Sequence, residues 1–348
     1  MQDSAPPYRA PWYFQDGLVQ TLLVSTQHGG AWVRRGERSP LAPRLPALPW
    51  QDHVFAGAEG VPLAGRYCAH PGRKARGTII ACYGITGTMQ TCWYIHYLAR
   101  KAFARGYDVV IYDWRGHGQS AALSAVPPSD GWRDGEDILH IAHQAFDLGC
   151  AAPAIPVGFS LGGQLVLWSL KVAYQLGDAA ITGACTVCPN LESSWSLAFL
   201  RTTVGGRLIE SALVNELCRE VRLRIERYPE YVPEGVLDRL KVIPDFDREL
   251  VIDYYRFSSV EEYYRQTSGL YLLEDLHLPN LILYAADDPM FAPRIVGELE
   301  RRVAQNSHTK LLLTGQGGHV GYIGLPTRFE DEFWALNRVL DFCDRLSS

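Results

Sequence analysis

The chain has 348 residues, of which 47% are hydrophobic and 20% charged, the balance of an ordinary soluble globular protein. A net charge of −5 argues against nucleic-acid binding, which calls for a clustered basic face. No run approaches the roughly 18 consecutive apolar residues that a membrane-spanning helix needs, and the stretch from Met1 to Trp12 lacks the apolar core of a secretory signal peptide. We therefore expect a soluble, cytoplasmic protein, built as one large domain with an insertion or as two modest domains.

Along the chain, an irregular start gives way to a regular alternation of strands and helices. Residues 1–50 are rich in proline and aromatic residues, and we assign residues 1–63 to a segment that wraps the domain as irregular structure with short strands. The elements predicted next are strands at 78–83, 107–112, 154–159 and 180–187, alternating with helices at 89–105, 130–148 and 161–176. Near-continuous apolar strands that alternate with helices predict a parallel sheet covered on both faces.

The alternation is interrupted between residues 189 and 278. This stretch has a mostly helical pattern and many charges, so it predicts a helical cap inserted over the C-terminal edge of the sheet. The pattern resumes with strands at 280–286 and 310–314 and helices at 293–304 and 328–346. The sequence thus predicts a core of residues 64–188 and 279–348 and a cap of residues 189–278.

The motif Gly158-Phe159-Ser160-Leu161-Gly162 lies between a predicted strand and a predicted helix. A Gly-x-Ser-x-Gly motif in this context forms a nucleophile elbow, a strained turn that exposes the serine hydroxyl while the glycines let neighbouring backbones approach. The alternative is a purely structural glycine-rich turn. The apolar strand before the motif and the largely apolar helix after it favour the elbow, so Ser160 is the candidate nucleophile.

A serine hydroxyl becomes strongly nucleophilic only when a base takes its proton, and after an elbow the acid and then the histidine follow in the chain. The strand at 280–286 runs into Asp287 and Asp288, and the spacing to the prolines that follow favours Asp288 as the acid. Asp287 is the alternative, and both residues could instead cap the next helix. His319 lies in a glycine-rich loop after the last strand, so it is the candidate base.

Attack on an ester carbonyl creates an oxyanion, which needs preorganised hydrogen-bond donors. The backbone N–H of Leu161, directly after the nucleophile, is the first candidate. The turn Tyr83–Gly87 follows an early strand, and we assign the second donor to the N–H of Ile85, which comes after a glycine.

Three other features have structural interpretations that we prefer. The eight cysteines are scattered, so buried thiols are favoured over disulfides and over a zinc or redox role for Cys185 and Cys188. Asp113 and His117 lie in a glycine-rich motif that we interpret as a turn held by Asp–Arg contacts. The basic stretch 218–227 is interpreted as a solvated helix face rather than as a surface for anions or lipids.

Beyond the serine, acid and histidine, three stretches resemble the YheT-like family of α/β-hydrolases, and the resemblance extends over about residues 11–340. The N-terminal stretch Trp12–Thr21 resembles the family's Asn-Gly-His-x-Gln-Thr signature. Asp245-Phe246-Asp247 with Glu262-Tyr263-Tyr264-x-x-x-Ser268 is similar to its Phe-Asp…Asp-Tyr-Tyr-x-x-x-Ser pattern. Asp287-Asp288-Pro289-Met290 resembles its Asp-Pro-Phe acid turn.

This resemblance implies the α/β-hydrolase fold, with a mostly parallel central sheet, helices on both faces and a helical cap insertion. It also implies hydrolysis of carboxylic esters, with lipid or acyl esters as substrates in several members. Two positions depart from the family. Tyr83 stands where the oxyanion turn usually has histidine, and Asp113 stands where an asparagine is frequent.

Together these residues predict a serine carboxylesterase that works through an acyl-enzyme intermediate on short or medium acyl esters or lipid esters. It requires no metal and no cofactor, and the oligomeric state stays open. The apolar pocket of the cap is expected from Trp195, Leu197, Phe199, Leu200 and Tyr254. Two alternatives remain, an acyltransferase that passes the acyl group to an alcohol and a catalytically silent binding protein of the same fold.

Overall fold

The structure is a computed structural model that describes residues 7–25, 45–72, 74–327 and 329–347. Residues 1–6 and 26–44 of the predicted wrapping segment therefore lie outside the described residues. Within the described parts, no helix is both long and apolar enough to cross a lipid bilayer.

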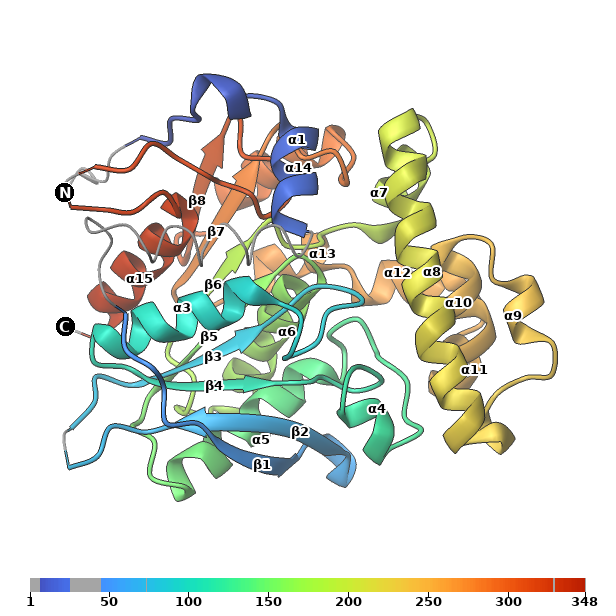
Figure 1. The fold of residues 1–348 in the computed structure, drawn as a ribbon, viewed down its shortest axis with the longest axis horizontal. Coiled ribbons are helices and arrows are strands. Elements are labelled where there is room, and N and C mark those ends of the chain that lie inside the picture. Colours follow the sequence, from blue (N-terminus) through green and yellow to red (C-terminus); the bar gives the residue numbers. More distant parts are fainter. Residues whose placement is uncertain (1–6, 26–44, 73, 328, 348) are drawn as a thin grey trace.

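A single eight-stranded sheet forms the centre of the molecule, in the order β1-β2-β4-β3-β5-β6-β7-β8 (Figure 1). Its strands are β1 (Gln51–Ala56), β2 (Pro62–Cys68), β3 (Thr78–Cys82), β4 (Asp108–Tyr112), β5 (Ala154–Phe159), β6 (Ala184–Val187), β7 (Asn280–Ala285) and β8 (Thr309–Thr314). The strand β2 runs antiparallel to both of its neighbours, β1 and β4, and the other neighbouring strands, from β4 across the sheet to β8, pair in parallel. The predicted mostly parallel sheet is therefore confirmed.

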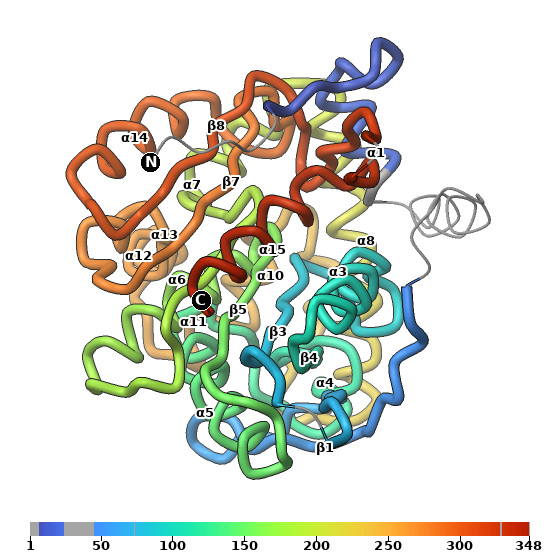
Figure 2. Tube along the Cα trace, turned by 90° about the vertical axis from the view of Figure 1, so that its left-hand side faces the viewer, coloured from blue at the N-terminus to red at the C-terminus, as the bar shows by residue number. Residues whose placement is uncertain are grey.

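Helices cover both faces of this sheet, as the end-on view shows (Figure 2). All residues of β3, β4 and β5 are buried, which explains why these strands read as continuous apolar runs. The helices α3 (Trp93–Ala104) and α15 (Trp334–Leu346) pack on one face. The helices α5 (Asp134–Asp147), α6 (Leu161–Leu176) and α14 (Arg294–Val303) pack on the other. The short α4 (Ser120–Leu123) follows β4, and 3-10 turns η1 (Trp12–Phe14) and η2 (Ala58–Gly60) lie early in the chain.

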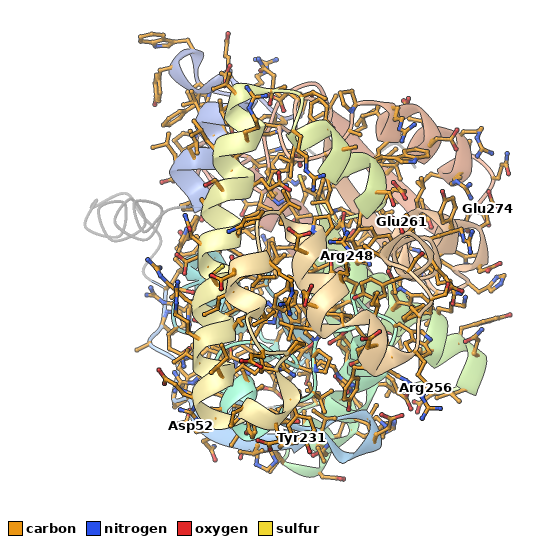
Figure 3. The ribbon with its side chains drawn as sticks, turned by 90° about the vertical axis from the view of Figure 1, so that its right-hand side faces the viewer. Asp52, Tyr231, Arg248, Arg256, Glu261 and Glu274 are labelled. Carbon is orange, nitrogen blue, oxygen red and sulfur yellow. The ribbon has the colours of Figure 1, made fainter. Side chains whose placement is uncertain are left out.

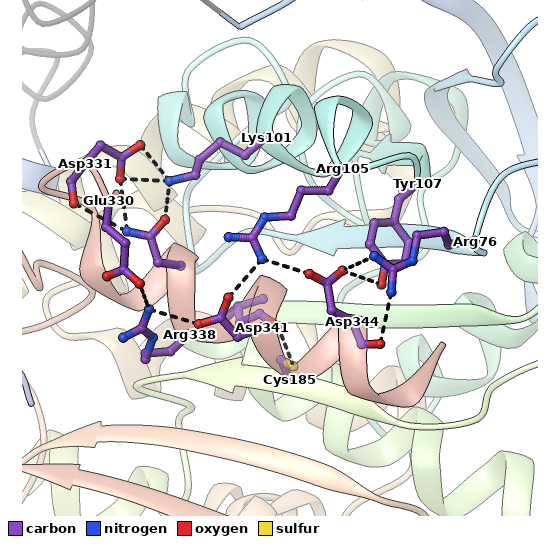
Figure 4. A network of polar contacts seen from close by, with 12 residues as sticks. Arg76, Lys101, Arg105, Tyr107, Cys185, Glu330, Asp331, Arg338, Asp341 and Asp344 are labelled. Atoms are coloured by element: carbon purple, nitrogen blue, oxygen red, sulfur yellow. Dashed lines mark hydrogen bonds and ion pairs between the residues drawn. The ribbon is translucent and has the colours of Figure 1, made fainter. Parts of the chain in front are cut away.

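Ion pairs fasten α15 to α3 across the edge of one face (Figure 4). Lys101 Nζ lies 2.6 Å from a carboxylate oxygen of Asp331 and 2.5 Å from the side-chain oxygen of Asn337. Arg105 Nη1 lies 2.9 Å from a carboxylate oxygen of Asp341. These contacts hold the C-terminal helix, and with it the loop that precedes it, on the sheet.

The stretch between β6 and β7 is helical and lies to one side of the sheet, over the carboxyl ends of its strands (Figure 1). Its elements are α7 (Ser193–Leu200), α8 (Val204–Arg227), η3 (Pro229–Tyr231), α9 (Val236–Arg239), α10 (Ile243–Leu250), α11 (Ile252–Tyr255), α12 (Val260–Thr267), α13 (Gly269–Leu272) and η4 (Leu273–Asp275). It has a small apolar core of its own, formed among others by Leu217, Val221 and Phe246. Figure 3 looks onto this cap, with α8 along its front and charged side chains such as Arg248 and Glu261 on its outside.

Several element boundaries differ from the sequence prediction. The helix predicted from residue 89 begins at Trp93, because Thr88 and Thr91 form a hydrogen-bonded turn first. The helix predicted from residue 130 begins at Asp134, whose carboxylate accepts hydrogen bonds from the preceding turn at Ser129. Such side-chain contacts with the backbone delay helix formation.

The N-terminal segment also differs from its prediction as irregular structure with short strands. It contains a helix, α1 (Gly17–Ser25), whose start is capped by the side chain of Asp16 through a 3.0 Å hydrogen bond from the N–H of Val19. The segment 51–56 pairs with β2 as an edge strand of the central sheet.

Candidate active site

Ser160 lies at the sharp turn between β5 and α6, as the elbow motif predicts. Its backbone has φ +54° and ψ −126°, a conformation that costs energy for any residue other than glycine and lifts the side chain out of the sheet. The turn also brings α6 very close to β3. A Cβ atom at Gly162 would lie 2.3 Å from the carbonyl oxygen of Tyr83, so only glycine fits there. These contacts fix the position of the Ser160 hydroxyl.

The structure brings the three predicted side chains together from three different strand ends. His319 Nε2 lies 2.8 Å from Ser160 Oγ, and His319 Nδ1 lies 2.8 Å from Asp288 Oδ2. Asp288, after β7, is 5% exposed, and His319, in the loop after β8, is 8% exposed. With the Nδ1–H donating to the carboxylate, Nε2 is free to accept the proton of the serine hydroxyl.

The neighbouring acid, Asp287, has a different contact. Its Oδ1 accepts a 2.9 Å hydrogen bond from the backbone N–H of Gly318, next to the histidine. The geometry thus separates the two candidate acids, because Asp288 contacts the imidazole and Asp287 contacts the loop that carries it.

The helix α1 also holds this loop, which the sequence reasoning did not foresee. Thr21 Oγ1 accepts a 2.8 Å hydrogen bond from the N–H of His319 and donates one of 2.7 Å to the carbonyl of Gly17. Gln20 Oε1 accepts from the N–H of Ile323 at 3.1 Å. Gln20 and Thr21 belong to the N-terminal stretch that carries the family resemblance. The sequence therefore marked these residues, but it did not show that they hold the histidine loop.

Leu161 and Ile85, which carry the two predicted oxyanion donors, line the same cavity as Ser160. Leu161 is the first residue of α6, so its N–H has no acceptor within the helix. The backbone of Gly84 packs so closely on the nucleophile that a Cβ atom there would lie 2.8 Å from the Cβ of Ser160. In the part of the chain that the structure describes, no backbone or side-chain acceptor takes the N–H of Ile85. Both N–H groups are therefore without an acceptor among the described residues.

A cavity that is open at its mouth lies between the core and the cap, and Ser160 is part of its lining. Its lining is mostly apolar and includes Ile85, Leu213, Leu217, Met290 and Phe291. Of the five cap residues predicted to form the pocket, Leu197 and Leu200 line the cavity, whereas Trp195, Phe199 and Tyr254 do not. Tyr254 lies on the surface with 48% of its area exposed.

The motif after β4 was interpreted as a turn held by Asp–Arg contacts, and the contacts differ from that expectation. The Asp113 carboxylate accepts hydrogen bonds from Tyr83 Oη at 2.8 Å and from the backbone of Met89 and Gln119. Arg115 instead pairs with Asp137 of α5 at 2.6 Å. The motif does form a turn, but Asp113 and Arg115 do not pair with each other, and each stabilises the turn through a different residue.

One group of side chains in the described residues has the donor atoms for a metal ion. Cys188 Sγ, an Asp288 oxygen and a His319 nitrogen lie within 4.8 Å of one another. Binding a metal would require the Cys188 thiolate, and burial raises the pKa of this thiol well above its usual range. It would also displace the hydrogen bond between His319 and Asp288, so this group of residues fits the triad better than a metal. Cys185 is likewise a buried free thiol.

Comparisons with known proteins identify the family of the chain. A family model described as "Alpha/beta hydrolase family" matches residues 71–332. "Putative esterase slr0264" of Synechocystis is 38% identical over 98% of this chain and 95% of its own length. "Putative esterase YheT" of Escherichia coli is 26% identical over 84% of each chain, and "Phospholipase ABHD3" of Mus musculus is 23% identical over 84% of this chain and 71% of its own. The esterase Pf2001 of Pyrococcus furiosus superposes with a TM-score of 0.58 at 17% identity, covering 86% of this chain and 94% of its own, and shows the fold alone.

Proposed function

The chain belongs to the alpha/beta hydrolase family, among its YheT-like members, and on this premise we propose that it is a serine carboxylesterase with Ser160, His319 and Asp288 as its catalytic triad. The observation that carries the proposal is the pair of 2.8 Å contacts that links Ser160 Oγ to His319 and His319 to Asp288. Esterase names among the relatives support ester hydrolysis in general.

In the first half of the reaction, Ser160 Oγ attacks the ester carbonyl carbon while its proton passes to His319 Nε2. The carbonyl oxygen becomes an oxyanion, held by the N–H groups of Leu161 and Ile85. When the intermediate collapses, the bond to the alcohol oxygen breaks and the alcohol leaves with the proton from His319. Asp288 stabilises the imidazolium and keeps its orientation.

In the second half, a water molecule attacks the acyl-enzyme and gives its proton to His319. The second oxyanion forms at the same place, and its collapse returns the proton to Ser160 and releases the carboxylic acid. The chemistry uses only side chains and backbone of this chain, so the proposal includes no metal and no cofactor.

The lining of the cavity favours substrates with an apolar acyl group of short or medium length, or with the acyl chain of a lipid ester. Apolar surface such as that of Leu200, Leu213 and Leu217 favours an alkyl chain over a polar one. We propose that residues 189–278 act as the cap that encloses this chain, over a core of residues 64–188 and 279–348.

The test is hydrolysis of p-nitrophenyl butyrate together with labelling by a fluorophosphonate probe. Wild type should turn over the ester and react covalently, and Ser160→Ala should do neither, with a loss of about 10⁴-fold or more. Ser169→Ala is the matched control, because Ser169 is buried in the same helix but donates only to the carbonyl of Val166. Equal rates for wild type and Ser160→Ala would contradict the proposal.

The same triad could pass the acyl group to an alcohol instead of water. Adding ethanol during turnover and analysing the products distinguishes the two, since an ethyl ester in place of the free acid would identify acyl transfer. A silent binding protein would give neither product.

A further inference from the structure

Two buried carboxyl groups line the same cavity as the nucleophile. Asp130 lies in the turn before α5, on the core, and Asp247 lies on α10, in the cap. Their residues are only 8% and 7% exposed, and both contribute to the cavity wall. The proposed triad uses neither of them.

The backbone at Asp130 has an energetically unfavourable conformation that its surroundings hold in place. Asp130 has φ +48°, a conformation that non-glycine residues adopt rarely. Its carbonyl accepts a 2.6 Å hydrogen bond from Gln164 Nε2 in α6. This hydrogen bond ties the backbone of Asp130 to the start of α6, the helix that directly follows the nucleophile.

Asp247 is positioned from the cap side. Tyr264 Oη on α12 donates a short hydrogen bond to Asp247 Oδ2, whereas no described residue donates to Oδ1. The neighbouring Tyr263 hydroxyl is close enough to Asp130 to lower the pKa of that carboxyl, yet it makes no hydrogen bond of ordinary geometry with a described residue. Polar groups at this end of the cavity are thus left without complete partners.

No cation among the described residues pairs with either carboxyl. Arg115 is buried nearby in the chain but is already bound to Asp137. Arg248, the residue after Asp247, is exposed on the outside of the cap and pairs with Asp245 (Figure 3). A buried carboxylate normally has a cationic partner, because removing the charge from water costs several kcal/mol.

The pKa values of both carboxyl groups are raised, as expected for buried acids that have no described cation in direct contact. Burial raises the pKa of Asp247 to about 7, although the hydrogen bond from Tyr264 and the charge of Arg248 act in the opposite direction. Burial first, and then the charge of Asp247, raise the pKa of Asp130 well above its usual range. A positive charge placed between them would offset both effects.

The aromatic rings of Phe246 and Tyr264 line the cavity beside the carboxyls. Aromatic faces attract alkylammonium groups, and together with carboxylates they form the usual surroundings of such cations. A hydroxyl group could bond to one carboxyl but would not stabilise the ionised form of the pair as a cation would. An anionic group would be repelled.

We propose that Asp130 and Asp247, with the rings of Phe246 and Tyr264, form a subsite for an alkylammonium group on the alcohol part of the ester. The apolar wall then receives the acyl chain, and the carboxyl pair favours cationic over neutral or anionic alcohols. This inference rests on the proposed esterase function and names a class of its substrates.

The experiment compares butyrylcholine with 3,3-dimethylbutyl butyrate, which has the same shape without the charge, by measuring released butyrate. Wild type should show kcat/KM at least about tenfold higher for the cationic ester. In Asp247→Asn the ratio should fall to within about twofold of one. Asp253→Asn, which removes an exposed carboxylate of the same cap, should keep the wild-type ratio. Asp130→Asn is a second variant, since asparagine adopts a left-handed backbone readily.

A wild-type ratio near one, or a ratio unchanged in both Asp247→Asn and Asp130→Asn, would overturn the subsite. Hydrolysis of p-nitrophenyl butyrate in the same preparations shows separately whether the esterase function holds. If no ester is hydrolysed, calorimetric titration of both butyrate esters into Ser160→Ala decides the matter without catalysis. Tighter binding of butyrylcholine supports the subsite, and equal or absent binding of both esters refutes it.

Discussion

Replacing Asp288 with asparagine tests which of two adjacent acids orients His319. The Asp288 carboxylate accepts hydrogen bonds of 2.8 Å from His319 Nδ1 and from the backbone N–H of Met290. An asparagine that keeps the contact with Met290 through its oxygen would turn its NH₂ group toward Nδ1. The imidazole would then carry its proton on Nε2 and could not accept the proton of Ser160.

The expected loss follows from these contacts. The pair is buried, so the variant loses both the correct tautomer and the negative charge that stabilises the imidazolium. In catalytic triads this change lowers kcat by about 10⁴-fold, which corresponds to roughly 5 kcal/mol of transition-state stabilisation. Asp287→Asn is the matched control. Its amide oxygen can still accept from Gly318 N–H, so we expect a loss below about tenfold.

Steady-state hydrolysis of p-nitrophenyl butyrate by wild type and both variants measures the difference, with circular dichroism to check that each variant is folded. Asp288→Asn with more than about a tenth of the wild-type kcat would refute the assignment. Asp287→Asn with the larger loss of the two would assign the acid to the other residue.

Three further predictions test the surroundings of the site. Thr21→Val removes the acceptor for the N–H of His319 and should lower kcat about tenfold with little change in KM, while Thr21→Ser should restore it. Lys101→Met leaves the carboxylate of Asp331 buried without its cation and should lower the free energy of unfolding by about 3 kcal/mol in urea denaturation. Because the pKa of Asp247 is raised to about 7 in the folded protein, its contribution to stability is present at acidic pH and is lost as the pH rises from about 4 to 7. Asp247→Asn should therefore gain about 2 kcal/mol of stability relative to wild type between pH 5.5 and 7.5, measured by denaturation at each pH.

Much of the framework could be predicted from local sequence patterns. The strand β5 and the helix α6 have the predicted bounds, because an apolar strand and a largely apolar helix meet at a glycine-flanked serine. The starts of α3 and α5 were placed too early, because side chains such as Thr88 and Ser129 bond to nearby backbone and hold a turn where the pattern already reads as helix. The helix α1 was missed because proline and aromatic residues around it suggested irregular structure.

For the candidate site, too, the sequence predicted some features and left others undecided. Local motifs pointed to Ser160, His319 and a choice of two acids, since each residue follows a strand and parallel strands end at one edge of the sheet. The sequence could not decide how Asp287 and Asp288 divide their contacts, because adjacent residues point in different directions only once the loop of His319 has folded against them.

By itself, the sequence predicted most of the strands and helices of the core, the helical stretch between β6 and β7, and Ser160 and His319 as candidate nucleophile and base. Each of these depends on hydrophobic periodicity or on a motif of a few neighbouring residues. Only the tertiary structure decided that Thr21 holds the histidine loop, that Arg115 pairs with Asp137, and that Asp130 and Asp247 face one cavity. These contacts join residues far apart in the chain, and their side chains meet only because the sheet and the cap bring separate elements together.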